Sequence, residues 1–224
     1  MSVLYVVATP IGNLEDITLR AIRILGEVDF VLCEDTRVTK KLLSHYNINT
    51  STISYHANSK ITKLEKILEL LEDGKNLALV SDAGTPAVSD PGVQLVSEIR
   101  EKLPDVKIET VPGASALTAA ISVAGVPSAR FTFLGFLPHK KGRETLFTEI
   151  AASDTTTIFY ESPHRIIKTL ESLAQHCPDK NITIARELTK IYESVVSGKP
   201  AEVLQYYDEN KDEVRGEFVV FVSI

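Results

Sequence analysis

Short apolar runs rich in β-branched residues alternate with helical segments along the first half of the chain. Four of these runs have the length and composition of strands: residues 4–8, 30–33, 77–80 and 106–111. Strands that are separated by helices are typical of βαβ units. The first half is therefore predicted to form a parallel sheet flanked by helices.

The helices between these runs are predicted from apolar residues that recur every three to four positions. One such segment covers residues 17–25. In a second segment the apolar residues form a single face: Ile61, Leu64, Ile67, Leu68 and Leu71. We expect the second helix to end at Gly74, because glycine commonly follows the last helical turn. An alanine-rich helix is predicted to begin near Ala114.

The second half of the chain has five further strand-like runs: residues 131–134, 157–160, 182–185, 194–196 and 218–222. Because the last of them follow one another closely, a mixed sheet is predicted there. Residues 125–130, Gly-Val-Pro-Ser-Ala-Arg, have the composition of a joint. We therefore expect two α/β domains, residues 1–125 and 126–224.

Composition narrows the class of protein. The chain has 224 residues, of which 44% are apolar, as expected for one or two globular domains. No run approaches the roughly 18 apolar residues of a membrane span, and no signal peptide is visible, so a cytoplasmic protein without membrane contact is expected. Cys33 and Cys177 lack the spacing of a redox or metal site, so no metal is expected. The net charge of −6 argues against indiscriminate nucleic-acid binding.

Turn-forming and acidic residues follow five of the predicted strands, in residues 9–14, 33–37, 81–92, 111–116 and 159–165. Any one of these segments could be a plain turn with a helix cap, since Ser, Thr, Asp, Gly and Pro serve both purposes. Five in succession favour ligand loops at the carboxyl ends of strands. The chain has neither GxGxxG nor GxxxxGK[ST], which argues against nicotinamide and ATP chemistry.

Seven sequence blocks carry a resemblance to a known family: VATPIGNLEDIT, LCEDTR, LVSDAGTPAVSDPG, VPGASALTAA, FLGFLP, FYESPHR and ARELTK. The chain resembles the tetrapyrrole methylase superfamily of S-adenosylmethionine-dependent methyltransferases, and within it the group that acts on ribosomal RNA. The resemblance implies two α/β domains with S-adenosylmethionine in the cleft between them, and a homodimer. It also implies 2′-O-methylation of a cytidine ribose in the decoding centre of 16S rRNA, with that RNA or the small ribosomal subunit as partner.

The resemblance also implies positions for the cofactor-binding residues. The loops of the first domain would contact the methionine and ribose parts of the cofactor through Pro10, Ile11, Gly12, Asp82, Ala83, Gly84, Thr85, Val88, Ser115 and Ala116. The second domain would contribute toward the adenine through Tyr160, Glu161, Glu187, Leu188 and Gly216. For Gly12 and Gly84 a plain turn, and for Glu161 and Glu187 a paired surface carboxylate, are the alternative interpretations.

A neutral ribose hydroxyl is a poor nucleophile, so a base or a cation beside it should help methyl transfer. The candidates are Glu34, Asp35, Arg37, His56, Asp82, Arg186 and Lys190. We expect Asp35 and Asp82 to accept the proton or organise the site, and Arg37 to anchor phosphate. Alternatively, Arg37 pairs with Glu34 or Asp35, and His56 is an ordinary loop histidine.

The densest cationic cluster consists of His139, Lys140, Lys141 and Arg143. It suits RNA phosphates, although a solvated basic loop is an equally ordinary explanation. Two other functions stay open at this point: C-methylation of a tetrapyrrole, and binding without catalysis in ribosome assembly. The basic cluster, together with the SDAGTP form of the central motif, favours RNA over a tetrapyrrole.

Overall fold

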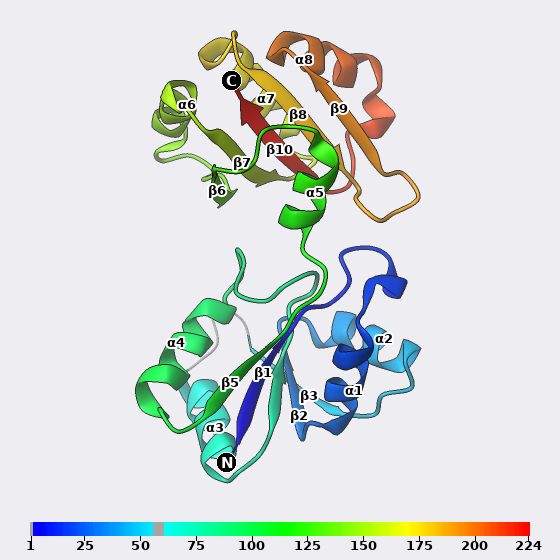
Figure 1. Cartoon of the computed structure of the whole chain (residues 1–224), viewed down its shortest axis with the longest axis vertical. Coiled ribbons are helices and arrows are strands. Elements are labelled where there is room, and N and C mark those ends of the chain that lie inside the picture. The colour runs from blue at the N-terminus through cyan, green and yellow to red at the C-terminus, as the bar shows by residue number, and fades with distance from the viewer. Residues whose placement is uncertain (1, 56–60) are drawn as a thin grey trace. The chain divides into compact units, whose positions relative to one another are not determined.

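The computed structural model describes residues 2–55 and 61–224, and its contacts divide the chain into two α/β units, Met1–Ser115 and Ala116–Ile224 (Figure 1). Helix α5 (Ala116–Ala124) belongs to the second unit because it packs against strands β8 and β10 of that unit. The division therefore falls after Ser115, before the segment 125–130 that the sequence suggested as a joint.

The first unit contains a five-stranded sheet in the order β3-β2-β4-β1-β5, and every neighbouring pair is parallel. Its strands are β1 (Val3–Val7), β2 (Phe30–Cys33), β3 (Ser51–Ser54), β4 (Leu77–Leu79) and β5 (Lys107–Val111). In the register, Tyr5 of β1 lies beside both Ala78 and Glu109. The parallel sheet predicted from the alternating pattern is confirmed.

Helices cover both faces of this sheet (Figure 1). One apolar cluster joins the strands to α1 (Leu19–Glu27) and α2 (Thr36–His45), and a second cluster joins them to α3 (Ile61–Glu72) and α4 (Gly92–Lys102). A short 3-10 helix, η1 (Leu14–Asp16), precedes α1. The side chains of Thr18 and Asp35 cap α1 and α2 by accepting hydrogen bonds from first-turn amides.

The strand order creates a switch point between β1 and β4. After β1 the chain crosses toward β2, and after β4 it crosses in the opposite direction toward β5, although β1 and β4 are neighbours in the sheet. The loops that leave two such strands therefore diverge to opposite faces and leave a crevice at the carboxyl ends, where open α/β sheets bind ligands.

The second unit contains a mixed sheet in the order β6-β7-β10-β8-β9. Its strands are β6 (Phe131–Phe136), β7 (Thr156–Glu161), β8 (Asn181–Arg186), β9 (Ser194–Gly198) and β10 (Phe218–Ser223). Strands β6 and β7 are parallel, and the other neighbouring pairs are antiparallel. The mixed sheet predicted for the second half is confirmed.

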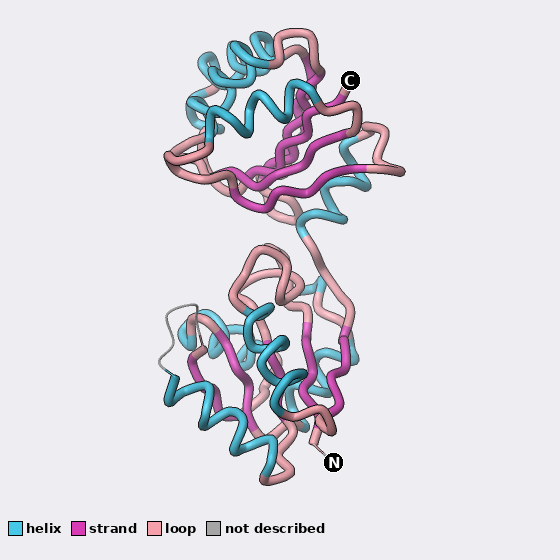
Figure 2. Tube along the Cα trace, turned by 90° about the vertical axis from the view of Figure 1, so that its left-hand side faces the viewer, coloured by secondary structure: helices cyan, strands magenta, loops and turns pink. Residues whose placement is uncertain are grey.

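Three helices pack against one face of this second sheet: α6 (Arg143–Ala152), α7 (Ile166–His176) and α8 (Pro200–Glu209). The strands and flanking helices of this unit can be followed in Figure 2. Alternate residues of β10, such as Phe218 and Val220, lie in the core beneath these helices. Their neighbours Val219 and Phe221 point to the opposite face and are buried as well. A 3-10 helix, η2 (Lys211–Glu213), leads into β10.

In the part of the chain that the structure describes, no helix is both long and apolar enough to cross a bilayer.

Candidate functional site

The loops after β1 and β4 are joined directly at the switch point. The amide of Thr9 donates to the carbonyl of Gly84 at 2.9 Å, and the amide of Gly84 donates back to Thr9 at 3.0 Å. The Thr9 hydroxyl lies 3.2 Å from the carbonyl oxygen of Ser81. These bonds hold the two loops against each other at the carboxyl ends of β1 and β4.

Three of the predicted cofactor loops converge on Gly84. A Cβ on this residue would lie 3.2 Å from Cγ2 of Ile11, 3.7 Å from the carbonyl oxygen of Ala114 and 3.9 Å from Cα of Ser115. The Thr85 hydroxyl also donates to the Ala114 carbonyl at 3.0 Å. Because Gly84 has a φ of +81°, a side chain there would also strain the backbone. Glycine thus allows the loops after β1, β4 and β5 to meet.

The remaining loop residues expected to contact the cofactor lie around this convergence in the first unit or at its border. Pro10 and Ile11 are buried, whereas Gly12, Asp82 and Ala83 are exposed; the half-buried positions are Thr85, Val88, Ser115 and Ala116. Ala116 begins α5 and so belongs to the second unit.

The predicted catalytic residues are also brought together. Oδ1 of Asp82 accepts a hydrogen bond from the amide of Asp35 at 3.1 Å, which joins the carboxyl ends of β4 and β2. Arg37 binds the Asp35 carboxylate through Nε and Nη2, with the shortest contact at 2.6 Å. The guanidinium and amide of Arg37 lower the pKa of Asp35 to about 2. Of the two interpretations of Arg37, the structure therefore contains the ion pair with Asp35.

Glu34, one residue earlier, has the opposite electrostatic environment. Burial raises its pKa, and the carboxylates of Asp90 and Asp82 raise it further. None of the described residues donates a hydrogen bond to its carboxylate. A carboxyl group in these surroundings is a stronger base than Asp35, which is stabilised as an anion by Arg37.

The loop after β4, residues 81–92, is called the central loop here. Two of its non-glycine residues adopt left-handed backbone conformations, Ala87 with φ 68° and Ser89 with φ 64°. The Asp90 carboxylate stabilises this turn by accepting hydrogen bonds from the amide of Ala87 at 2.8 Å and from the amide of Gly92 at 2.7 Å. Left-handed conformations of such residues are costly and cluster at functional sites. Asp90 was not among the residues predicted for the site, although Ser89-Asp90 repeats the Ser81-Asp82 step in the sequence.

In the second unit, the segment after β8 also contains non-glycine residues with left-handed backbone conformations. Glu187 and Thr189 have φ values of 51° and 67°. The Glu187 carboxylate accepts hydrogen bonds from Nζ of Lys190 at 2.7 Å and from the amide of Glu217 at 3.0 Å. Burial opposes ionisation, but the Lys190 ammonium and this amide lower the pKa of Glu187 overall.

The other expected adenine-side residues lie on neighbouring elements of this unit. Leu188 is buried, and Gly216 packs directly under the Glu187 side chain. The Tyr160 ring contacts Phe133 and Phe136, with ring centroids 5.0 and 5.4 Å away, and burial raises its pKa. Glu187, Leu188 and Gly216 are therefore brought together by the ends of β8 and β10.

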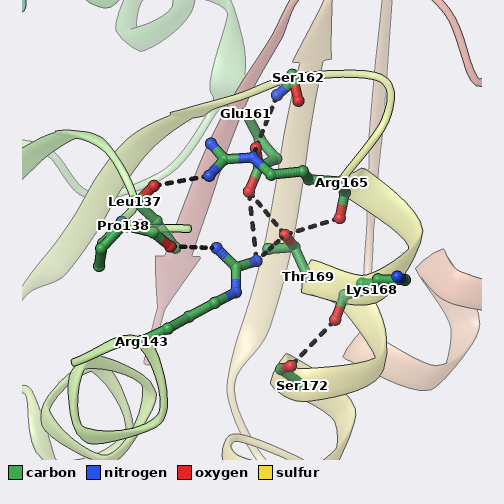
Figure 3. A network of polar contacts seen from close by, with 9 residues as sticks. All are labelled: Leu137, Pro138, Arg143, Glu161, Ser162, Arg165, Lys168, Thr169 and Ser172. Atoms are coloured by element: carbon green, nitrogen blue, oxygen red, sulfur yellow. Dashed lines mark hydrogen bonds and ion pairs between the residues drawn. The ribbon is translucent and has the colours of Figure 1, made fainter. Parts of the chain in front are cut away.

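Glu161 differs from the other expected cofactor residues. Its side chain is fully buried beneath α6 and α7, where it contacts Arg165, Arg143 and Thr169 (Figure 3). It is thus part of a buried ion pair, whereas the alternative interpretation was a paired carboxylate on the surface. Arg143, expected to bind RNA, takes part in this network with only 12% of its side chain exposed.

The other members of the basic cluster, His139, Lys140 and Lys141, are exposed. Among the remaining candidates for the base, Arg186 is buried and pairs with Glu213, and Lys190 pairs with Glu187 and Glu217. His56 lies outside the described residues. Within the described ranges, no group of three or more His, Cys, Asp or Glu side chains is arranged to hold a metal ion.

Comparisons with solved structures agree on the fold. Diphthine synthase matches with a TM-score of 0.73 at 16% identity, covering 100% of this chain and 90% of that one. Uroporphyrin-III C-methyltransferase from Thermus thermophilus, solved with S-adenyl homocysteine, matches with a TM-score of 0.67 at 21% identity over 99% and 97% of the two chains.

Sequence comparisons are more specific. The family described as Tetrapyrrole (Corrin/Porphyrin) Methylases matches residues 3–204. Proteins named ribosomal RNA small subunit methyltransferase I are 41% identical in Thermotoga maritima, over 100% of this chain and 99% of the relative, and 44% identical in Bacillus subtilis, over 100% and 75%. The chain belongs to the tetrapyrrole methylase family and, within it, to the group of ribosomal RNA small subunit methyltransferase I.

Proposed function

We propose that the protein transfers a methyl group from S-adenosylmethionine to the 2′-hydroxyl of a cytidine ribose in 16S rRNA. The observation that carries the proposal is the convergence of three strand-end loops on Gly84, in a chain that is 41% identical over its full length to a ribosomal RNA small subunit methyltransferase. Because the proposed substrate is ribosomal, we also propose a cytoplasmic location.

The loops around Gly84 fit a cofactor that approaches the backbone closely. A Cβ on residue 84 would crowd Ile11 and strain the backbone, so the site depends on a residue without a side chain there. Bound S-adenosylmethionine would supply an electrophilic methyl group. In this proposal Ile11, Asp82 and Ser115 line the methionine and ribose side, and neighbouring positions of the same loops contribute backbone contacts.

That Tyr160, Glu187, Leu188 and Gly216 reach the adenine stays a prediction of the resemblance. The left-handed conformations of Glu187 and Thr189 support a functional role for that segment. We assign no cofactor contact to the Glu161 side chain, since Arg165 and Thr169 already bind its carboxylate. The homodimer likewise stays a prediction of the resemblance.

We assign proton acceptance to Glu34. Its raised pKa makes it a better base than Asp35, whose pKa of about 2 reflects the pairing with Arg37. Asp35, Asp82 and Arg37 then organise the site: Asp82 fixes the start of α2 through the Asp35 amide, and Arg37 presents an exposed guanidinium edge to a phosphate. Alignment of the ribose oxygen with the methyl group supplies much of the acceleration, because well-oriented groups reach effective molarities of about 10⁵ M or more.

Two other functions are distinguishable from this one. The solved uroporphyrin-III C-methyltransferase matches at 21% identity, which supports a shared fold alone. The relatives from Thermotoga maritima and Bacillus subtilis, at 41% and 44% identity, carry the name of an rRNA methyltransferase. A binding protein without catalysis would keep the loops around Gly84, and only an activity measurement separates it from an enzyme.

The decisive experiment incubates purified protein with radiolabelled S-adenosylmethionine and small ribosomal subunits from a strain that lacks the equivalent enzyme. Nuclease digestion and mass spectrometry then locate the label. Label on the ribose of a single cytidine is the expected result. Cofactor binding with no label on RNA would overturn the proposal and favour either a tetrapyrrole substrate or a silent binding protein.

A further inference from the structure

The buried carboxylate of Glu161 is linked to the basic loop, which we define as residues 138–142. Glu161 is the last residue of β7, and none of its side chain is exposed. Its Oε1 lies 2.7 Å from Nε of Arg165 and accepts the amide of Ser162 at 2.8 Å. Its Oε2 accepts the Thr169 hydroxyl at 2.7 Å and lies 3.5 Å from Nη2 of Arg143 (Figure 3).

Both arginines also bind the start of the basic loop. Nη1 of Arg165 donates to the carbonyl of Leu137 at 2.8 Å, and Nη1 of Arg143 donates to the carbonyl of Pro138 at 3.2 Å (Figure 3). Arg143 itself follows the loop as the first residue of α6. One carboxylate therefore holds the loop at both of its ends.

The charges of this network exceed what neutralisation requires. One cation is enough to neutralise the single negative charge of the buried carboxylate, and Nε of Arg165 lies 2.7 Å from it. Arg143 adds a second guanidinium, which reaches Thr169 at 2.6 Å and is 12% exposed. The second cation is explained by its other contact, the one with Pro138.

Between the fixed ends, His139, Lys140 and Lys141 are exposed. The amide of Arg143 donates to the carbonyl of Lys140 at 3.2 Å, and Gly142 adopts a left-handed φ of 81° that closes the turn. Three cationic or protonatable side chains thus project from a loop whose backbone is already ordered. Such order reduces the conformational entropy lost when the side chains bind phosphates.

We infer that Glu161 is a positioning residue for RNA: through Arg143 and Arg165 it holds the basic loop in the conformation in which Lys140 and Lys141 contact phosphate. The inference rests on the proposed function for its RNA part. The positioning of the loop itself does not depend on RNA and can be measured separately.

The test compares Glu161→Gln with Glu213→Gln. Glu213 pairs with Arg186 in the same unit, at 3.4 Å, so the control also removes an ion pair from this unit but has no contact with the loop. Because Gln at a buried position beside two arginines can impair folding, Thr169→Val serves as a second variant. It removes the hydroxyl that contacts both Arg143 and Glu161 and leaves the pair of Glu161 with Arg165 in place.

Two readouts are needed. Trypsin cleavage after Lys140 and Lys141 in native protein reports the order of the loop, and steady-state methylation of small subunits separates KM from kcat. For Glu161→Gln we expect faster cleavage at these two sites and a KM for subunits raised about three- to tenfold, with kcat and the affinity for S-adenosylmethionine retained. Thr169→Val should change both values in the same direction by less, and Glu213→Gln should change neither.

Unchanged cleavage in Glu161→Gln and Thr169→Val would show that Glu161 does not order the loop. Faster cleavage with an unchanged KM would show that the loop order does not serve RNA binding, and either result overturns the inference. Equal changes in Glu213→Gln would overturn it too, since they would reflect general loosening of the unit. Failure of the wild-type protein to methylate RNA refutes the proposed function instead, and the trypsin comparison then still decides the role of Glu161 in the loop.

Discussion

Glu187 covers Gly216: the Glu187 carboxyl group occupies the space in which a side chain on residue 216 would begin. The two residues come from segments far apart in the sequence, the end of β8 and the approach to β10. The amide of Glu187 donates to the carbonyl of Glu217 at 3.0 Å, and the Glu217 amide donates back to the Glu187 carboxylate. The contact fixes the conformation of the segment expected to reach the adenine.

Gly216→Ala should destabilise the second unit by about 2–3 kcal/mol. About 1 kcal/mol comes from the left-handed φ of +87°, and the rest from displacing Glu187 from its hydrogen bonds with Lys190 and Glu217. Gly125→Ala is the matched control, because Gly125 also has a positive φ but open space around it, so only the backbone cost of about 1 kcal/mol is expected. Denaturant unfolding measures both, and equal losses would contradict the packing argument.

Gly84→Ala should weaken S-adenosylmethionine binding by at least about tenfold, and Gly84→Val should weaken it further. The added Cβ crowds Ile11 and the backbone around Ala114 and Ser115. Gly74→Ala is a close control in the same unit, because Gly74 has the same φ of +81° with nothing within 4 Å. Calorimetric titration with the cofactor distinguishes the variants. If Gly84→Val bound as tightly as the wild type, the central loop would not be the cofactor site.

Glu34→Gln should lower kcat by roughly 10²- to 10⁴-fold, the usual contribution of a general base. In the wild type, kcat should fall as the pH is lowered through the pKa of Glu34, which lies above its ordinary value of 4.5, because only the carboxylate accepts a proton. If Asp35 were the base, the fall in kcat would instead occur near pH 2. Asp35→Asn keeps a good helix cap and should reduce kcat far less. A collapse of kcat in Asp35→Asn with Glu34→Gln unaffected would reverse the assignment.

Lys140→Glu with Lys141→Glu should raise the KM for small subunits and reduce the salt dependence of binding. Two lost phosphate contacts correspond to a change of about 1.4–1.8 in the slope of log K against log salt. Affinity for S-adenosylmethionine should not change. Lys66→Glu with Lys211→Glu gives the same charge change at two other exposed positions and is the control for net charge. Normal methylation by the Lys140 and Lys141 variant would mean that the loop does not contact RNA.

Tyr207→Phe should stabilise the second unit by about 1 kcal/mol. The hydroxyl of Tyr207 is buried without a hydrogen-bond partner among the described residues, and burial raises its pKa well above the ordinary range. The neighbouring Tyr206 donates to Glu213 at 3.2 Å, so Tyr206→Phe should not stabilise and is the natural comparison. Urea unfolding of the two variants gives the sign of the change in the free energy of unfolding. A loss of stability in Tyr207→Phe would mean that the Tyr207 hydroxyl has a hydrogen-bond partner in solution.

Periodicity predicted both sheets because their strands are strongly apolar, but it missed β3 and several helices, α2 among them. Strand β3 reads Ser-Thr-Ile-Ser and is only half-buried at the sheet edge, so its burial signal is weak. Helix α2 begins Thr-Arg-Val-Thr-Lys-Lys and buries only Thr39 and Leu43. The joint at 125–130 has the composition of a linker, yet the contacts of α5 with β8 and β10 decide where the units divide.

The candidate site was predictable where function depends on backbone, and less so where it depends on side-chain direction. The small residues around Gly84 indicate that other atoms approach the backbone closely there, whatever the surrounding structure is. For β7, by contrast, alternate residues face opposite sides, and the sequence does not say whether Tyr160 or Glu161 faces the helices. Similarly, Asp35 and Glu34 are adjacent carboxylates, and their pKa values differ only through the three-dimensional structure: Arg37 lowers that of Asp35, whereas burial and two nearby carboxylates raise that of Glu34.

The paired hydrogen bonds between Thr9 and Gly84 have a thermodynamic consequence. Because they join two loops that diverge to opposite faces of the sheet, the loops are ordered when the first unit folds. A ligand that binds there meets a surface that has already lost its conformational freedom, so its affinity is reduced little by loop ordering. The amides of Thr9 and Gly84 should then exchange with solvent deuterium as slowly as those of the central strands before any ligand is added.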